Sequence, residues 1–200
     1  MSTSNDIIRI TRIIESRLPQ LVKADRLRHI KGVVATAVSL AERFGVSVHQ
    51  SRLAAVAHDM DRDTSTSRLL ARIADWEIDL IPFERKNPTV LHGPVSAERL
   101  HREFFLQNQD VLGAVRHHTL GHPVYLDQKQ PIGLVLFVAD FCEPGRLFPD
   151  RELRAMILAQ DSLAAMATRI IRVSRDRFGP LEEPTAQLYA RLSGDYGNGS

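Results

Sequence analysis

The sequence lacks the features that mark secreted, disulfide-bonded or membrane-spanning proteins. It has a single cysteine, Cys142, so no internal disulfide can form, which fits a reducing compartment. Its longest uninterrupted apolar stretch runs from Ile132 to Ala139, whereas a bilayer span needs ~20 residues. The first residues, Met1 to Asp6, are polar and lack the apolar segment of a secretory signal. We therefore expect a cytoplasmic protein that does not enter a membrane.

A strong excess of charge is also missing. The 26 lysines and arginines nearly balance the 24 acidic residues, and the net charge of +2 is too small for a dedicated nucleic-acid binder. Of the basic residues, 22 are arginines, whose planar fork suits phosphate groups. With 200 residues, of which 44% are hydrophobic and 25% charged, the chain has the length and composition of about one globular domain.

The hydrophobic pattern is helical along nearly the whole chain. Apolar residues recur at spacings of three and four, which predicts an all-α, single-domain helical bundle over residues 1–193 and a flexible tail over 194–200. The stretch from Asp79 to Gly93 is irregular and is expected to be a loop. We expect one helix through Ile7 and Ile14 that ends at Pro19, and further helices over Asp25 to Gly45, Leu53 to His58, Leu69 to Trp76, Pro94 to Phe104, Asp110 to His117, Lys129 to Phe141, Asp150 to Arg177 (the longest) and Ala186 to Leu192.

Histidine and aspartate stand at unusual places in this pattern. The pair His58-Asp59 directly follows the apolar run from Leu53 to Ala57, and Asp140 interrupts a segment that is apolar on every face of its helix. Burying an unpaired carboxylate is costly. A metal ion or a strong hydrogen-bond network is therefore the simplest explanation for these residues.

The spacing of the histidines and aspartates suits a site shared by several helices. Successive candidates are 22 to 33 residues apart, which is about one helix plus a loop, so each can come from a different element and point into one cavity. Histidine and carboxylate ligands without thiolate favour iron(II), manganese or zinc. The candidates are His29, His58, Asp59, His92, His118 and Asp140.

The same residues carry a resemblance to a known family. Their order is similar to the H…HD…D pattern of the HD-domain phosphohydrolases, and the surrounding segments resemble more narrowly the YqeK family of these enzymes. The resemblance covers about residues 8–192 and implies an HD-type bundle with a central metal site and the symmetrical cleavage of diadenosine tetraphosphate into two ADP. The segments are Arg26-Leu27-Arg28-His29, Ala57-His58-Asp59, Leu91-His92-Gly93, Arg116 to Gly121 and Val138 to Arg146.

The resemblance also implies roles for single residues. Iron(II), with manganese or cobalt as substitutes, would be held by His29, His58, Asp59 and Asp140. Catalysis would involve Asp59, His92 and His118, and the two histidines would either contact phosphate or hold a second metal. The substrate would meet Arg26, His92, His118, Arg146 and Thr185, the last of these in a loop from Leu181 that closes over the nucleoside.

The chain departs from the family pattern at two points. Arg62 stands where HD enzymes often have lysine, and Thr185 is followed by Leu188-Tyr189-Ala190 instead of an Arg-Asn pair. Three functions stay open: the tetraphosphatase, another HD phosphohydrolase that acts on a cyclic dinucleotide, an alarmone or a deoxynucleotide, and a metal-holding nucleotide sensor without turnover. The expected partner is a dinucleoside polyphosphate or another nucleotide, and the chain is expected to be a monomer or a homodimer.

Other histidines and arginines have structural explanations. We expect His117 to pack or orient its neighbours, His122 to lie in a turn near the site, and His49 and His101 to be solvated. An alternative to phosphate contact for Arg146 is an ion pair with Glu143. A solvated helix face is expected for Arg151, Arg154, Arg169 and Arg172, and a core stripe for Met156, Ile157, Leu163, Met166 and Ile170.

Overall fold

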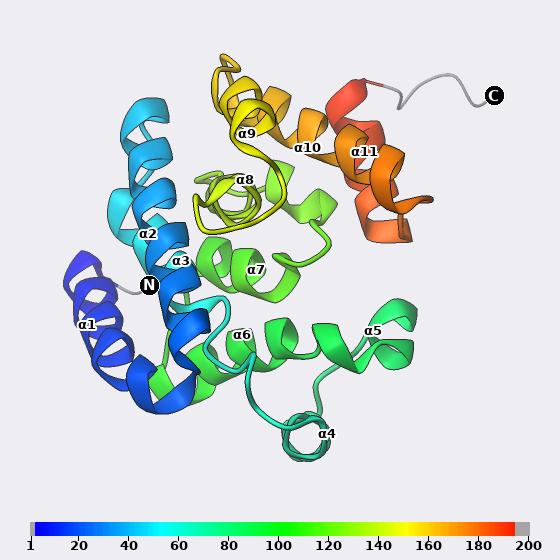
Figure 1. The fold of residues 1–200 in the computed structure, drawn as a ribbon. Coiled ribbons are helices and arrows are strands. Elements are labelled where there is room, and N and C mark those ends of the chain that lie inside the picture. Colours follow the sequence, from blue (N-terminus) through cyan, green and yellow to red (C-terminus); the bar gives the residue numbers. More distant parts are fainter. Residues whose placement is uncertain (1–2, 195–200) are drawn as a thin grey trace.

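The computed structural model describes residues 3–194, and this part of the chain folds into helices without a strand (Figure 1). The all-α prediction is confirmed, and no described helix is long and apolar enough to cross a membrane. Most of the predicted tail, residues 195–200, lies outside the described residues. The elements are α1 (Ser4–Leu21), α2 (Ala24–Phe44), α3 (Val48–Ala57), α4 (Thr66–Asp75), α5 (Pro82–Lys86), η1 (Pro88–Val90), α6 (His92–Phe104), α7 (Gln109–His117), η2 (Pro123–Leu126), α8 (Ile132–Cys142), α9 (Arg151–Leu158), α10 (Leu163–Phe178) and α11 (Glu183–Ser193).

Helix α8 lies at the centre of the fold. It packs against α2, α3, α7 and α10, and Figure 1 shows these helices around it. Nearly all of its side chains are buried, because its sequence is apolar on every face, the pattern of a core helix. Asp140, in the last turn, is the polar exception. The most apolar helix therefore delivers a carboxylate to the middle of the molecule.

Helices α2 and α3 place the His58-Asp59 pair beside this carboxylate. Small buried residues, Ala54, Ala55 and Ala57, let the end of α3 approach its neighbours closely. The helix ends at Ala57, and the two residues that follow lie in a turn inside the core. Their side chains are 0% and 5% exposed, so most of their contacts are with groups that the fold itself provides.

Two predictions at the start of the chain are wrong in detail. Helix α1 passes through Pro19 to Leu21, because the proline ring is exposed in the last turn while the buried Leu18 and Val22 hold that turn against the core. Helix α2 has Lys23 as its N-cap, and Asp25 lies inside the first turn, where a carboxylate stabilises the helix dipole. The predicted end of α2 at Gly45 is confirmed, since this glycine is the C-cap with φ 66°.

The stretch predicted as a loop, Asp79 to Gly93, contains α5, η1 and the start of α6. Prolines open α5 and η1 at their first position, where the missing N–H has no helical partner in any case. His92 is the first residue of α6, two residues earlier than predicted. A cluster of prolines therefore marks helix starts here instead of irregular backbone.

The predicted long helix from Asp150 to Arg177 is two helices, α9 and α10. Ser162 interrupts it, because its hydroxyl accepts a hydrogen bond from the Ala165 N–H and caps α10. Within residues 3–194 the longest helix is thus α2, with 21 residues. The predicted core stripe holds except at Met156, which is 44% exposed on α9.

Candidate metal centre and active site

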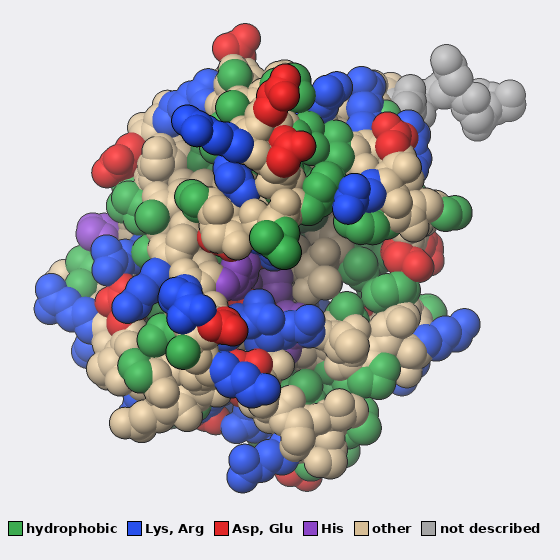
Figure 2. All heavy atoms as spheres, viewed as in Figure 1, with side chains coloured by type: hydrophobic (Ala, Val, Ile, Leu, Met, Phe, Trp, Pro, Cys, Tyr) green, Lys and Arg blue, Asp and Glu red, His purple; other side chains and the backbone are tan. Residues whose placement is uncertain are grey.

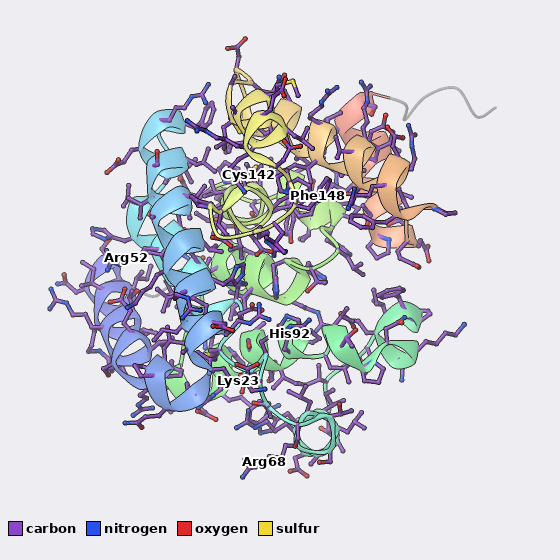
Figure 3. The ribbon with its side chains drawn as sticks, in the orientation of Figure 1. Lys23, Arg52, Arg68, His92, Cys142 and Phe148 are labelled. Atoms are coloured by element: carbon purple, nitrogen blue, oxygen red, sulfur yellow. The ribbon has the colours of Figure 1, made fainter. Side chains whose placement is uncertain are left out.

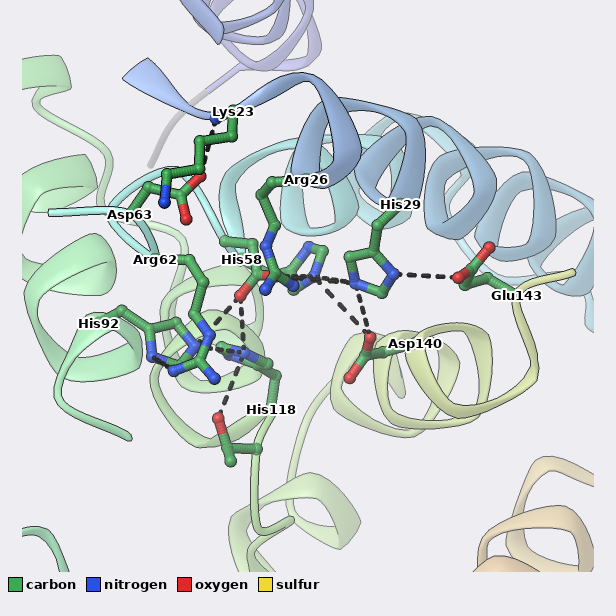
Figure 4. A network of polar contacts seen from close by, with 12 residues as sticks. Lys23, Arg26, His29, His58, Arg62, Asp63, His92, His118, Asp140 and Glu143 are labelled. Carbon is green, nitrogen blue, oxygen red and sulfur yellow. Dashed lines mark hydrogen bonds and ion pairs between the residues drawn. The ribbon is translucent and has the colours of Figure 1, made fainter. Parts of the chain in front are cut away.

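Six predicted residues converge at the centre of the bundle (Figure 4). They come from five separate parts of the chain, and each lies within a helix or directly after its end. Figure 3 shows one of them, His92, directed toward the middle of the molecule, whereas Arg52 and Arg68 lie at its outer edge. The contributors are His29 on α2, His58 and Asp59 after α3, His92 on α6, His118 after α7 and Asp140 on α8.

Backbone carbonyls fix the orientation of three of the histidine rings. In each ring Nδ1 faces the carbonyl three residues earlier in the chain, and since a carbonyl only accepts, Nδ1 carries the proton. Nε2 is then a free lone pair that points inward, which is the form that binds metals. The acceptors are Ala55 O for His58 (2.7 Å), Thr89 O for His92 (3.1 Å) and Val115 O for His118 (2.8 Å).

Asp59 joins the histidines into two groups of donors. Its Oδ2 lies 3.6 Å and 3.5 Å from Nε2 of His29 and His58, and its Oδ1 lies 3.1 Å and 3.6 Å from Nε2 of His92 and His118. In each group the donor atoms lie within 4.8 Å of one another.

Asp140 completes the first group, with its Oδ1 3.0 Å from Nε2 of His29. Imidazole and carboxylate donors converging at this spacing fit a divalent transition metal, and the aspartate shared by both groups allows a second ion.

The electrostatics keep both aspartates of the cluster ionised. Burial raises the pKa of Asp59, but its contacts with His58 and His118 outweigh burial and hold this pKa well below its usual range. Burial also opposes ionisation of Asp140, yet its contact with His29 and the Arg146 charge lower its pKa. The pKa of His92 falls to about 4, mainly through burial. Near neutral pH both carboxylates are charged and His92 is neutral.

Three arginines surround the donor groups. Arg26 places Nη1 2.6 Å from Asp59 Oδ2, and Arg146 donates to the carboxylate and the backbone carbonyl of Asp140. Arg62, at the position of the family's lysine, donates to the Thr89 carbonyl beside His92. The alternative pairing of Arg146 with Glu143 is wrong, because the turn after α8 directs its guanidinium back to Asp140.

A cleft of about 740 Å³ opens from this cluster to the surface. Figure 2 shows a hollow with histidine side chains at its floor and basic side chains beside it. Its polar lining includes the three arginines with Asp59, His92, His118 and Asp140. Its apolar lining comes mainly from α8, α10 and the segments that follow them, and includes Phe137, Phe141, Leu147, Phe148, Ile170, Phe178 and Leu181; Figure 3 labels Phe148.

The predicted nucleoside loop, Leu181 to Thr185, also lines this cleft. The Thr185 hydroxyl donates to the Leu120 carbonyl at 2.7 Å, so it ties α11 to the turn after His118. Thr185 is therefore placed beside the site but its only donor is already engaged in the fold.

Among the remaining histidines, His117 and His122 form a separate stacked pair with ring centroids 4.1 Å apart. Burial lowers the pKa of His117 to about 3, so it stays neutral near pH 7. The expectation of a packing role for His117 fits this geometry. His49 is exposed as expected, and His101 is half-buried, with Nδ1 3.1 Å from the Leu106 carbonyl after the end of α6.

Arg154 was expected on a solvated face, and this is wrong. It donates to the carbonyls of Arg146 and Pro149 at 3.0 Å and 2.9 Å and so supports the turn that carries Arg146. A long side chain at the start of α9 reaches back over this turn, which local periodicity does not reveal.

Two buried carboxylates close to the cluster, Glu143 and Asp61, have contacts that the sequence does not predict. Glu143, at the end of α8, has Oε1 3.1 Å from His29 Nδ1. Asp61 lies two residues after Asp59 and accepts from Arg72 (2.6 Å), Arg99 (3.2 Å) and Ser96 (3.3 Å). The sequence offers one signal for these two carboxylates, which is that each lies close to a buried motif. Their partners are distant in the sequence, so the spacing of residues does not reveal the contacts.

Substitution of the adjacent histidines separates their roles. We expect His118→Ala to reduce turnover far more than His117→Ala, because Nε2 of His118 faces Asp59 while His117 stacks on His122 outside the cluster. Steady-state kinetics with metal titration on both variants measures this. Loss of metal in step with activity indicates a second ion at His118, and retained metal with weaker substrate binding indicates phosphate contact. Equal, mild effects would contradict the placement of the active face.

The all-helical bundle, its central histidine and aspartate donors and its arginine-lined cleft define a metal-dependent phosphohydrolase. The HD domain family model matches residues 26–145. This chain belongs to the HD-domain family, as the resemblance of its motifs predicted.

Three relatives share one more specific name within this family. A protein of Bacillus subtilis is 36% identical over 131 residues, which cover 65% of this chain and 67% of the relative. A protein of Halalkalibacterium halodurans is 34% identical over 139 residues (66% and 71%), and one of Staphylococcus aureus is 29% identical over 161 residues (79% and 77%). All three are named symmetrical bis(5'-nucleosyl)-tetraphosphatase.

A solved structure shares the fold. It is described as a predicted HD superfamily hydrolase involved in NAD metabolism from Clostridium acetobutylicum, with a TM-score of 0.78 and 24% identity. The similarity covers 92% of this chain and 97% of that one. The HD-type helical bundle is thereby confirmed over nearly the whole length.

Proposed function

We propose that this protein cleaves diadenosine tetraphosphate symmetrically into two ADP with the help of a divalent metal. The observation that carries the proposal is Asp59, which is shared by two groups of metal donors and lines a cleft that also holds arginines and aromatic rings. The names of the three relatives support the same reaction. A polyphosphate chain flanked by nucleosides fits such a cleft, because the arginines suit its phosphates and the aromatic rings suit its bases.

The donor set indicates where the metal would bind. His29, His58, Asp59 and Asp140 would hold one ion, for which we propose iron(II) with manganese or cobalt as substitutes. His92 and His118 would hold a second ion together with Asp59. A bound ion supplies Lewis acidity toward phosphoryl oxygens and lowers the pKa of water toward ~7 in favourable cases.

The surrounding side chains have separate roles in phosphate binding, ligand orientation and proton transfer. Arg26, Arg62 and Arg146 bind the non-bridging phosphate oxygens through charge-assisted hydrogen bonds and offset the charge of the phosphate chain. Asp59, with its low pKa, holds and orients groups better than it accepts protons. His92 is neutral near pH 7 and serves as a ligand. In the alternative in which no second ion is bound, a protonated His118 Nε2 would neutralise or protonate the leaving phosphate.

The apolar part of the cleft takes one nucleoside. Phe148 contacts both Phe141 and Phe178 edge to face, with centroids 5.7 Å and 5.8 Å apart, and Arg177 lies 4.4 Å over the Phe148 ring. Aromatic walls of this kind hold a planar base by stacking. With one base there, the phosphates extend inward past Arg146 toward the metal donors.

A product assay tests the proposed reaction. Purified protein with added iron(II) or manganese is incubated anaerobically with diadenosine tetraphosphate, a cyclic dinucleotide, an alarmone and a deoxynucleotide. ADP as the sole product of the first compound is expected. AMP plus ATP would contradict symmetrical cleavage, turnover of another compound alone would indicate a different HD phosphohydrolase, and binding without product would indicate a sensor. A cytoplasmic location, action without nucleic acid, and a monomeric or dimeric state stay predictions.

Anaerobically purified protein is expected to carry about one or two divalent transition metals per chain, because Asp59 serves two donor groups. Elemental analysis measures the ratio, and dialysis against a chelator should abolish turnover until iron, manganese or cobalt is added back. Metal-free protein whose activity no ion restores would contradict the proposed metal centre.

A further inference from the structure

His29 differs from the other three histidines of the cluster in the partner of its Nδ1. The others donate to neutral backbone carbonyls, whereas His29 faces the carboxylate of Glu143 at 3.1 Å (Figure 4). The two residues are 114 positions apart in the sequence and come from α2 and the end of α8. The tertiary fold, and not a local turn, therefore creates this contact.

The Glu143 carboxylate is held in place from several sides. Its side chain is 4% exposed, and its second oxygen, Oε2, accepts the Gly145 N–H at 2.7 Å. On α2, Gly32 leaves the space that the carboxylate fills, because a Cβ at this position would overlap Oε2. Both oxygens are thus engaged, and the carboxylate has no room to turn away from His29.

An anionic acceptor changes the ligand strength of an imidazole. A hydrogen bond from Nδ1–H to a carboxylate fixes the ring and raises the electron density at Nε2, and loss of such an outer partner costs 10- to 100-fold in metal affinity in other metal sites. A neutral carbonyl orients the ring but polarises it less. The position shared by His29 and His58 therefore has a stronger donor than the position shared by His92 and His118.

We propose that Glu143 is a positioning residue that orients His29 and makes the ion position of His29 and His58 the tighter of the two. The inference rests on the metal-holding part of the proposed function and on no property of the substrate. It also assigns a role to Gly32, which keeps the space for the carboxylate open.

Metal titration without nucleotide tests this proposal. Cobalt(II) affinity is measured by chelator competition in the intact protein and in Glu143→Gln, Glu143→Ala and Gly32→Ala. We expect the tighter binding class to weaken about 10- to 100-fold in all three, since the glycine variant displaces the same carboxylate. Gly113→Ala is the matched control, because its Cβ would meet side-chain atoms of Gln128 and Val124 only at 3.4 Å and 3.8 Å; its affinity should not change.

Nitrogen-15 spectra of the histidine rings give a second readout. The Nδ1–H signal of His29 should move or vanish in the Glu143 variants while those of His58, His92 and His118 stay in place. Unchanged cobalt affinity in both Glu143→Gln and Gly32→Ala, or weakening confined to the looser class, would overturn the proposal. An intact protein with two binding classes but no hydrolase activity would count against the proposed function alone.

Discussion

Asp59→Ala is expected to lower the rate of hydrolysis by at least ~10³-fold, the scale of one lost transition-state interaction of ~4 kcal/mol. The carboxylate is the one donor common to both metal groups and the partner of Arg26, so its removal affects both ion positions and one phosphate-binding arginine. Turnover measured at saturating manganese, together with metal content, checks this. Helical content should persist, because the hydrophobic core does not depend on this side chain.

Asp25→Ala is the control for this substitution. Asp25 lies in the same helix as Arg26, but its side chain is 87% exposed and pairs only with Arg28 at the surface. We expect near-normal turnover from it. Near-normal turnover from Asp59→Ala as well would reject the assigned site.

Asp61→Ala should instead act on stability, with a loss of about 3 kcal/mol in the free energy of unfolding. Asp61 is 1% exposed and pairs with Arg72 and Arg99, so alanine leaves two arginine partners behind in or near the core. The loss lies at the low end for a broken buried ion pair because Arg99 keeps Glu103 and Arg72 is partly solvated. Urea unfolding followed by circular dichroism measures it.

Two further variants delimit this effect. Asp61→Asn keeps the shape and a hydrogen-bond acceptor and should lose less stability than alanine, while Asp75→Ala on the exposed face of α4 should stay within about 0.5 kcal/mol of the parent. If Asp61→Ala is as stable as the parent protein but inactive, Asp61 acts in catalysis and not in stabilising the fold.

The sequence reveals those parts of the fold that depend on local pattern. The apolar run of α8 predicted a central helix, and its interruption by Asp140 predicted a carboxylate that the fold places beside His29. Gly45 marked a helix end because its φ of 66° suits glycine. The spacing of the histidines placed them on separate helices, and this was enough to group them.

Long-range contacts and local caps explain what the sequence did not reveal. Glu143 meets His29 across 114 residues, and no periodic pattern encodes such a pairing. Ser162 splits one predicted helix into two by a single side-chain cap, while the apolar spacing continues across the break. Helix α1 continues through Pro19, since tertiary packing of Leu18 and Val22 outweighs the hydrogen bond that the proline cannot donate.

The carbonyl-anchored rings of His58, His92 and His118 have a consequence for metal selection in the cell. Their Nε2 atoms are oriented by the backbone, so an ion that binds at the proposed site would meet donor atoms already in place, and the order of affinities would depend on the ion more than on the protein. For nitrogen and oxygen donors that order rises from manganese through iron and cobalt to copper, with zinc above iron. Mismetallation is therefore the expected hazard, and the turnover of any preparation will follow the metals to which the cells and buffers exposed it.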